Sequence, residues 1–397
     1  QPRSRGLGDV YKRQVTFRLH FQDIGTAQLR WTAQPTAARA SGLSAAQIRD
    51  GSDQVEQSLA INYPTPLLLH HHLQLLAPST SPQDLLASLP ANLRDGKGKI
   101  EVEFCQSILS ELDRHAKFLF SYPHGCIEQT SSSTIPWLCY SALKPYVRAL
   151  ATISAEQAQA HLRSGVDRLI SMQLSDGRFS YWPGSTEAVD WATSYAGMVL
   201  ALAEKQGCTV PANVLQRLTT ALENSLSQNY SPQMTATDEA HCKTLYTLAL
   251  LGKPHLAEQT RQREQVSQLS PVAKIMLALA LLESKAASAS EAIALLNASS
   301  NANARSASSV THLDSPRLEL LARATMEPNS PSCLAILQRM FLDNSSTNAF
   351  TTYVSAWDML ACAAFARSQT ATNQVQVSVA TQDQQLSLIH ISEPTRP

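Results

Sequence analysis

Hydrophobic and polar residues alternate along the first quarter of the chain, as they do in strands with one buried face. The alternation covers residues 15–21 (VTFRLHF) and 27–33 (AQLRWTA), and it returns in the IEVEF of 94–104 (RDGKGKIEVEF) after a hairpin-turn signal. The two prolines within 64–66 argue against a central strand there. We therefore expect β-sandwich segments over residues 15–104.

The spacing of apolar residues changes to three and four from about residue 105, which is typical of amphipathic helices. Gly, Pro, Asn or Ser separates the successive segments. Helix–turn–helix units of about 35–45 residues fit either a closed α/α toroid or an α-solenoid over residues 105–370. The predicted helices cover residues 127–147, 157–173, 191–206, 211–227, 238–251, 255–267, 271–283, 288–297, 316–325, 331–342 and 355–367.

The alternation returns once more in QVQVSVA, within residues 371–385, where we expect a single return strand. The order along the chain is therefore β, then a long helical region, then β. Because each β stretch is short for an independent domain, this order predicts a helical domain inserted into a β domain.

The two ends of the chain differ in character from the rest. Residues 1–14 (QPRSRGLGDVYKRQ) lack periodicity, and residues 386–397 (LSLIHISEPTRP) follow a polar strand abruptly. Both resemble read-through of sequencing adapters, and we exclude them from the fold. We expect a fragment whose gene continues on both sides. The lack of a signal peptide at its start is then consistent both with a cytoplasmic protein and with an internal piece of a larger protein.

The charges of the chain balance. Its 397 residues include 32 Lys and Arg and 32 Asp and Glu, so the net charge is zero, and no nucleic-acid partner is expected. Hydrophobic residues make up 44% and charged residues 16%, which suits a large core and not a disordered chain. No apolar run reaches the ~18 residues that a membrane span needs.

One segment, residues 121–130 (SYPHGCIEQT), carries candidate chemistry. Cys126 and Gln129 are three positions apart, and side chains at this spacing are neighbours in a helical turn. A thiol at a helix start experiences the positive end of the helix dipole, which favours the nucleophilic thiolate. Its attack on the Gln129 amide displaces ammonia and leaves an internal thioester, with Glu128 placed to shuttle protons. The alternative for Cys126 is a buried free cysteine.

The neighbours of this pair have supporting roles in the thioester hypothesis. Pro123 fixes the approach of the chain, and Gly125 permits a tight backbone turn before the cysteine. Tyr122, Tyr181 and Trp182 are candidates for shielding the bond from water, with aromatic packing as the alternative.

The motif resembles the thioester site of the alpha-2-macroglobulin family. The vertebrate form of that site reads GCGEQ, and the bacterial form usually reads YPYGCLEQT. This chain has YPHGCIEQT, which departs only at His124 and Ile127. The resemblance continues downstream in SMQLSDGRFSYWPG (171–184), WATSYAGMVLALAEKQG (191–207) and WDMLACAAFAR (357–367), and it covers nearly all of residues 15–385.

The resemblance implies both a fold and a function. The fold is an α/α toroid of about six helix pairs, inserted between CUB-like β segments, with the end of a macroglobulin-like domain before them. The function is that of a fragment of a bacterial broad-spectrum endopeptidase inhibitor that takes part in host defence. It traps proteinases covalently through their lysine amines, and this single-use acylation is not enzyme turnover. The resemblance further implies no cofactor or metal and a periplasmic location with an inner-membrane anchor. Peptidoglycan-synthesis proteins of the envelope are further partners.

Two other function classes stay open. A helical interaction scaffold with an unformed or spent thioester is the first. The second is a terpene-cyclase-like toroid enzyme, because residues 173–177 weakly echo a repeat glutamine motif; no DxDD or DDxxD cluster accompanies them.

Other chemistry-bearing residues are interpreted as structural. In complement-type relatives a distant histidine attacks the thioester, but that histidine precedes the helix in which His241 lies, so His241 is a weak candidate. His70–His72 alternate faces on a strand and make a poor metal site, and Asp176–Gly177 fits a turn between helices. The remaining cysteines are expected in the core: Cys105, Cys139, Cys208, Cys242, Cys333 and Cys362.

Overall fold

The structure is a computed structural model with two compact units, residues 1–72 and 73–397, which we describe separately. The residues that it describes are 16–34, 42, 44–50, 53–62, 73–76, 84, 102–228, 235–298, 311–342, 351–369, 375–380 and 385–391.

The first unit contains one antiparallel hairpin. Strand β1 (Gly25–Ala33) pairs with β2 (Asp53–Ile61), in a register that joins Gly25 to Ile61 and Ala33 to Asp53, and the short helix α3 (Ala45–Asp50) lies between them in sequence. The Arg30 Nε donates to Glu56 across the two strands at 2.7 Å. The predicted strand at 27–33 is therefore confirmed.

Two other predicted strands are wrong within the described residues. Residues 16–21 have no strand pairing, and the Phe17 ring packs against the Trp31 ring of β1 instead, with centroids 4.8 Å apart. Residues 102–104 also lie outside any strand. Alternation of polar and apolar residues indicates that a segment can form a strand. A strand forms only where a second segment hydrogen-bonds to it, and the alternation does not say which segment that is. The turn signals at 64–66 and 94–99 lie outside the described residues, as do His70–His72, and the sandwich over 15–104 stays a prediction.

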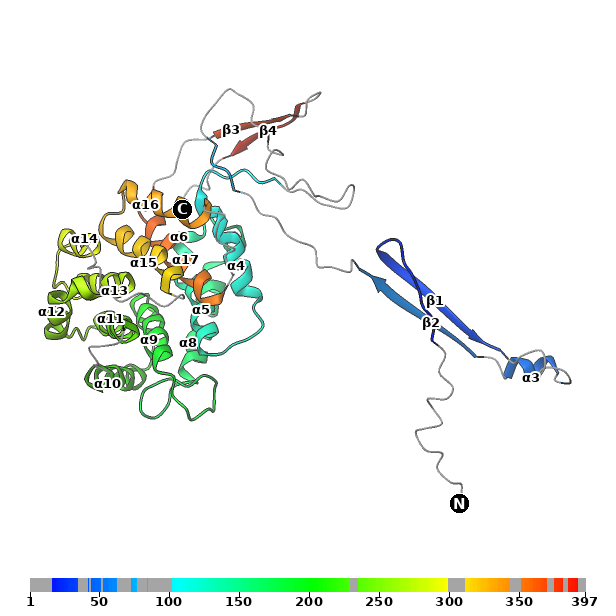
Figure 1. The fold of residues 1–397 in the computed structure, drawn as a ribbon, viewed down its shortest axis with the longest axis horizontal. Helices are drawn as coiled ribbons and strands as arrows, with labels where there is room; N and C mark the ends of the chain where they lie inside the picture. The colour runs from blue at the N-terminus through cyan, green and yellow to red at the C-terminus, as the bar shows by residue number, and fades with distance from the viewer. Residues whose placement is uncertain are drawn as a thin grey trace, which may run out of the picture. The chain divides into compact units, whose positions relative to one another are not determined.

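The second unit is mainly helical (Figure 1). Its first helices are η1 (Ile108–Glu111), α4 (Leu112–Ser121), α5 (Ile127–Leu138), α6 (Tyr140–Leu143), α7 (Arg148–Ala151), α8 (Ala155–Ile170) and α9 (Asp190–Lys205). They are followed by α10 (Ala212–Gln228), α11 (Thr235–Leu250), α12 (Leu256–Glu264), η2 (Val266–Gln268), α13 (Pro271–Glu283), α14 (Ala289–Asn297), α15 (Thr311–Met326), α16 (Pro331–Leu342) and α17 (Thr352–Ala366).

Every helix predicted from apolar spacing is present, with bounds that shift by a few residues. The predicted helix over 127–147 is the exception, because the structure divides it at Cys139 into two shorter helices, α5 and α6. Gly207 and Gly252 adopt positive φ values of 81° and 71° after α9 and α11, as expected of glycines that end helices. The side chain of Ser154 caps α8 by accepting from the Gln157 N–H.

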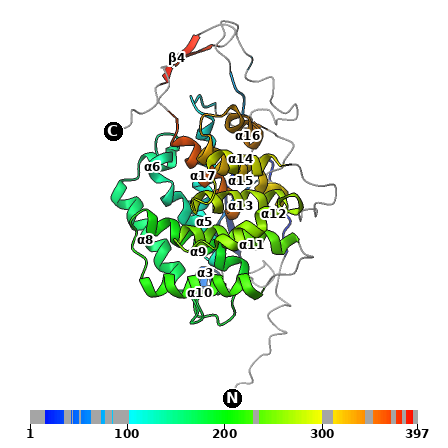
Figure 2. The ribbon, with the colours of Figure 1, turned by 90° about the vertical axis from the view of Figure 1, so that its left-hand side faces the viewer.

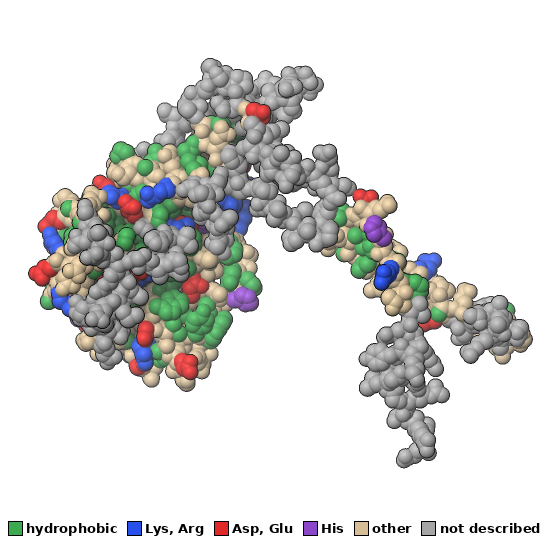
Figure 3. Space-filling model, in the orientation of Figure 1, with side chains coloured by type: hydrophobic (Ala, Val, Ile, Leu, Met, Phe, Trp, Pro, Cys, Tyr) green, Lys and Arg blue, Asp and Glu red, His purple; other side chains and the backbone are tan. Residues whose placement is uncertain are grey.

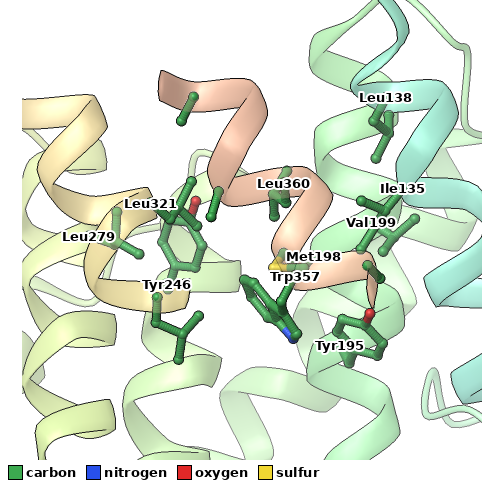
Figure 4. Close-up of a cluster of buried hydrophobic side chains, with 14 of the residues drawn as sticks. Ile135, Leu138, Tyr195, Met198, Val199, Tyr246, Leu279, Leu321, Trp357 and Leu360 are labelled. Atoms are coloured by element: carbon green, nitrogen blue, oxygen red, sulfur yellow. The ribbon is translucent and has the colours of Figure 1, made fainter. Parts of the chain in front are cut away.

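The central helices contact one another in a closed sequence. α5 packs against α9, α9 against α11, α11 against α13, α13 against α15 and α15 against α17, and α17 returns to α5. Figures 1 and 2 both show α9, α11 and α13 side by side. α8 covers α5, α14 covers α13 and α16 covers α15. Their buried side chains form one core, in which Trp357 of α17 is 2% exposed (Figure 4).

A close approach of two helices depends on Gly165. A Cβ atom there would lie 2.2 Å from the Thr134 Oγ1, so α8 and α5 can approach this closely only with glycine at that position. This contact holds α5 in place along the half that follows the Cys126 segment.

A second hairpin follows the helices. Strand β3 (Val375–Ala380) pairs antiparallel with β4 (Gln385–Ile391), which confirms a strand within 371–385. β4 lies mostly in residues 386–397, and the attribution of those residues to read-through stays a prediction. Among the residues that the structure describes, none of the helices combines the length and apolar character needed to cross a membrane.

Candidate functional site

Cys126 lies directly before the first residue of α5. It is the N-cap residue of that helix, with extended backbone angles of −70° and 175°, and it is 1% exposed. The Gln129 Oε1 accepts the Cys126 backbone N–H at 3.1 Å, and the Cys126 side chain lies over the backbone N–H of Gln129 in a reciprocal capping box. The structure thus brings together the two side chains that the sequence analysis paired.

The turn before Cys126 does not need a glycine. Gly125 has no positive φ, and a Cβ atom there would meet its nearest neighbour, the Thr130 Oγ1, at 3.7 Å. The tight turn expected at Gly125 stays a prediction, because neither its φ nor the space around it shows that the turn requires glycine. The Gly125 carbonyl accepts from Thr130 Oγ1 at 3.3 Å and from Arg168 at 3.4 Å, while Pro123 is exposed directly after the end of α4.

Tyr181 lies against Cys126. Its backbone carbonyl accepts the Ile127 N–H at 3.0 Å, and its phenol hydrogen-bonds with the Cys126 side chain. The electrostatic influence of Cys126 raises the pKa of Tyr181, and partial burial and the hydrogen bond act in the same direction. The ring of Tyr181 is 42% exposed, so its outer part faces solvent while its hydroxyl lies over the thiol.

Trp182 and Tyr122 contact other aromatic rings near this segment. The Trp182 ring is 5.8 Å from the Tyr181 ring and 45% exposed, and its carbonyl accepts from the Ser180 Oγ. Tyr122 packs edge-on against the rings of Phe118 and His124, at 5.4 and 5.8 Å. Hydrophobic side chains gather on the face of the helical unit seen in Figure 3.

Glu128 is held by hydroxyl groups from two helices. Thr352, the first residue of α17, lies with its Oγ1 2.9 and 2.7 Å from the two carboxylate oxygens. Ser132, one turn along α5, donates to the same carboxylate at 2.6 Å and lies 3.0 Å from the Tyr195 hydroxyl of α9. The carboxylate also lies at the N-terminal ends of both α5 and α17, where the helix dipoles favour a negative charge.

Comparison with known proteins places this arrangement in a family. The family model of the A-macroglobulin TED domain matches residues 99–229, which include the whole Cys126 segment. The Escherichia coli protein named alpha-2-macroglobulin is 34% identical over 104 residues. Together these findings support the bacterial alpha-2-macroglobulin family for the matched region.

The matched region is a small part of the alpha-2-macroglobulins to which it is similar. It covers 26% of this chain and 6% of the Escherichia coli protein. A crystal structure of native Escherichia coli alpha-2-macroglobulin from domain MG7 to the C-terminus aligns with a TM-score of 0.56 at 19% identity, over 71% of this chain and 45% of that one. Salmonella alpha-2-macroglobulin reacted with methylamine aligns at 0.57 and 23% identity, over 72% and 19%. These likenesses show the fold.

His241 makes a hydrogen bond between two helices of this unit. It lies within α11, as expected, and its Nε2 is 2.6 Å from Glu258 of α12. Burial lowers the pKa of His241, and the charge of Glu258 opposes that shift. These contacts give it a structural role in joining α11 to α12.

The glutamine motif that favoured a cyclase also has structural partners. Gln173 donates to the carbonyls of Gly177 and Val214 and accepts from Arg217 at 2.6 Å, so it joins the loop to α10. Asp176 and Gly177 form the turn that the sequence predicts, and Gly177 has φ +90°.

The other cysteines divide into buried and exposed. Cys105 is exposed, before the first helical turn, and the expectation that it lies in the core is wrong. The other predicted core thiols are buried, and burial raises the pKa of Cys139 to about 12. The expectation for Cys105 fails because a helical spacing of apolar residues assigns a face only where the helix forms.

Sequence reasoning missed three residues of this site. Thr352 and Ser132 bind Glu128, and Tyr195 hydrogen-bonds Ser132, but Thr352 is 224 positions away in the chain. Hydroxyl residues are too common for such a contact to be read from one sequence. The nearest signal was the predicted helix 355–367, which begins three residues after Thr352.

Proposed function

We propose that this chain is part of a bacterial alpha-2-macroglobulin that traps proteinases covalently through a thioester between Cys126 and Gln129. Proteins of this family are proteinase inhibitors and not turnover enzymes. Because the chain matches only a small part of its relatives, the trapping activity of the whole protein belongs to this proposal.

The chemistry needs only the two side chains and an amine. The Cys126 Sγ attacks the Gln129 Cδ, the C–N bond breaks and ammonia leaves, so the thiol proton ends on the leaving nitrogen. A lysine amine of the proteinase then attacks the same Cδ. An amide bond forms, the C–S bond breaks and the Cys126 thiol is regenerated by the proton from the amine. One chain reacts once, because the product amide is stable.

The observation that carries this proposal is the capping box at the start of α5. It holds the Cys126 and Gln129 side chains against each other's backbone, with the thiol 1% exposed. This closeness supplies the proximity on which an intramolecular acylation depends. Burial of the sulfur also keeps water from a bond that hydrolyses when exposed.

Glu128 and the aromatic residues assist in the proposed reaction. Glu128, fixed by Thr352 and Ser132, accepts the thiol proton during ring closure and passes it to ammonia. Tyr181 covers the sulfur from the solvent side, and Trp182 extends that cover.

The wider architecture is part of the same proposal. The closed sequence of contacts from α5 round to α17 supports an α/α toroid over residues 105–370. The hairpins before and after it are interpreted as pieces of macroglobulin-like and CUB-like β domains. By its family the full protein is expected in the periplasm, anchored to the inner membrane, with proteinases as partners and peptidoglycan-synthesis proteins as neighbours.

Labelling with a fluorescent primary amine tests this function. After incubation and peptide mapping, the label is expected as an amide on Gln129, with one new thiol at Cys126. Cys126→Ala and Gln129→Ala should lose the label and keep the helical circular dichroism spectrum, and Cys105→Ala, at an exposed cysteine, should keep the label. Labelling of Gln129 in Cys126→Ala would refute the mechanism. A wild-type chain without label would favour the scaffold alternative.

A further inference from the structure

A cavity of about 170 Å³ lies among α9, α11, α13 and α17, outside the Cys126–Gln129 pair. Five of its twelve lining residues are aromatic. Tyr195 stacks on Trp357 with centroids 6.0 Å apart, Tyr353 lies 5.2 Å from Tyr195 and 6.0 Å from Trp357, and Tyr246 adds a fourth ring. Figure 4 shows the Trp357 ring between those of Tyr195 and Tyr246 in that view. The exposed ring of Trp191 belongs to the same lining.

One polar atom in this lining has no partner. The indole N–H of Trp357 is buried, in a residue 2% exposed, and it donates to none of the atoms that the structure describes. A buried donor without an acceptor costs about 1–3 kcal/mol, and buried Trp N–H groups usually find a partner. Because Trp357 lines the cavity, an occupant that offers a hydrogen-bond acceptor could pair with this buried donor.

The charges in the lining oppose each other. Glu239 accepts a hydrogen bond from the Ser270 Oγ at 2.6 Å. Lys243 lies four positions further along α11, with its Nζ 3.4 Å from the Tyr353 hydroxyl and 6.0 Å from the centroid of the Tyr353 ring. A cationic ligand would be repelled by Lys243, and an anionic ligand by Glu239. The lining thus favours a neutral molecule that offers an acceptor to Trp357 and a donor to Glu239.

We propose that this cavity is a binding site for a small neutral aromatic amide or a molecule of the same chemistry. The ring stacks among the aromatic residues, the carbonyl accepts the Trp357 indole N–H, and the amide N–H donates to Glu239. The size agrees with this class, because an apolar cavity of about 150 Å³ accepts a single benzene ring.

The occupant would touch residues that hold the Cys126 segment. Tyr195 lines the cavity and hydrogen-bonds Ser132, which binds Glu128, and Tyr353 directly follows Thr352, which binds the same carboxylate. The binding proposal does not depend on thioester chemistry, so a binding measurement alone tests it.

Titration of the purified chain with benzamide tests the proposal. Calorimetry should show saturable binding, and the indole N–H resonance of Trp357, one of five in the spectrum, should shift as its proton gains an acceptor. Trp357→Phe removes that resonance and assigns it. Toluene, which has the ring without the amide, should bind about 100-fold more weakly, as loss of two buried hydrogen bonds predicts. Benzoate and benzylamine should bind more weakly than benzamide.

Two variants separate the donor from the ring. Trp357→Phe keeps an aromatic wall and should weaken benzamide about tenfold while leaving toluene unchanged. Trp137→Phe, at a tryptophan that stacks between Phe120 and His161 on another part of the unit, should bind benzamide as the wild type does. No binding of benzamide to the wild type, or an unshifted Trp357 resonance at saturation, would overturn the proposal. So would equal affinity in Trp357→Phe.

Discussion

Replacing Thr352 with Val removes a hydroxyl and keeps the shape of the side chain. In the native chain that hydroxyl lies 2.7 and 2.9 Å from the oxygens of Glu128, and Thr352 is 6% exposed. A hydrogen bond to a charged group contributes about 1.5–3 kcal/mol. Glu128 is half-buried and keeps its bond from Ser132, so the lower end applies, about 1.5 kcal/mol.

Urea denaturation followed by far-UV circular dichroism measures this difference. Thr352→Val should lower the unfolding free energy by about 1.5 kcal/mol at an unchanged denaturant slope. The matched control is Thr352→Ser, which keeps the hydroxyl and should recover most of the loss. The reasoning is refuted if Thr352→Val unfolds within about 0.5 kcal/mol of the wild type, the range of an ordinary surface change. It is also refuted if Ser is no better than Val.

Further predictions concern a histidine, two glycines and a cysteine. Burial lowers the pKa of His115 to about 3, so the unfolded chain alone takes up this proton between pH 7 and 5. Over that range the wild type should lose about 2 kcal/mol more stability than His115→Gln in urea melts; equal losses would contradict the burial argument. Gly177→Ala should cost more than about 2 kcal/mol, because φ is +90° and its Cβ would lie 2.1 Å from a carbonyl oxygen, whereas Gly125→Ala should stay within about 1 kcal/mol. Among the cysteines of the native chain, Cys105 alone should react rapidly with a thiol reagent, and Cys105→Ser should abolish the fast phase.

The helices could be predicted from the sequence because their signal is local. Apolar spacing of three and four, together with endings such as Gly207 and Gly252, depends only on neighbours within a few turns. The strands were harder, since residues 16–21 alternate as well as 27–33 do but only the latter find a partner. Pairing is decided by distant segments and by turns that alternation does not encode.

The candidate site divides in the same way. Cys126 and Gln129 are three positions apart, so one helical turn joins them and the sequence was sufficient to pair them. Two other contacts form only when α17 packs against α5 and α9: the hydrogen bond from Thr352 to Glu128 and the stacking of Trp357 on Tyr195. No local sequence pattern predicts that packing. For Gly125 the motif suggested a tight turn, but its φ is not positive and a Cβ atom there would have room, so the structure does not show a need for glycine.

The intact mass of the purified chain, before and after methylamine, tests the thioester most directly. The account predicts a mass below that of the plain sequence by one ammonia. Methylamine should then add its full mass, and one new thiol should appear at Cys126. A mass equal to that of the plain sequence, unchanged by methylamine, would contradict a thioester between Cys126 and Gln129.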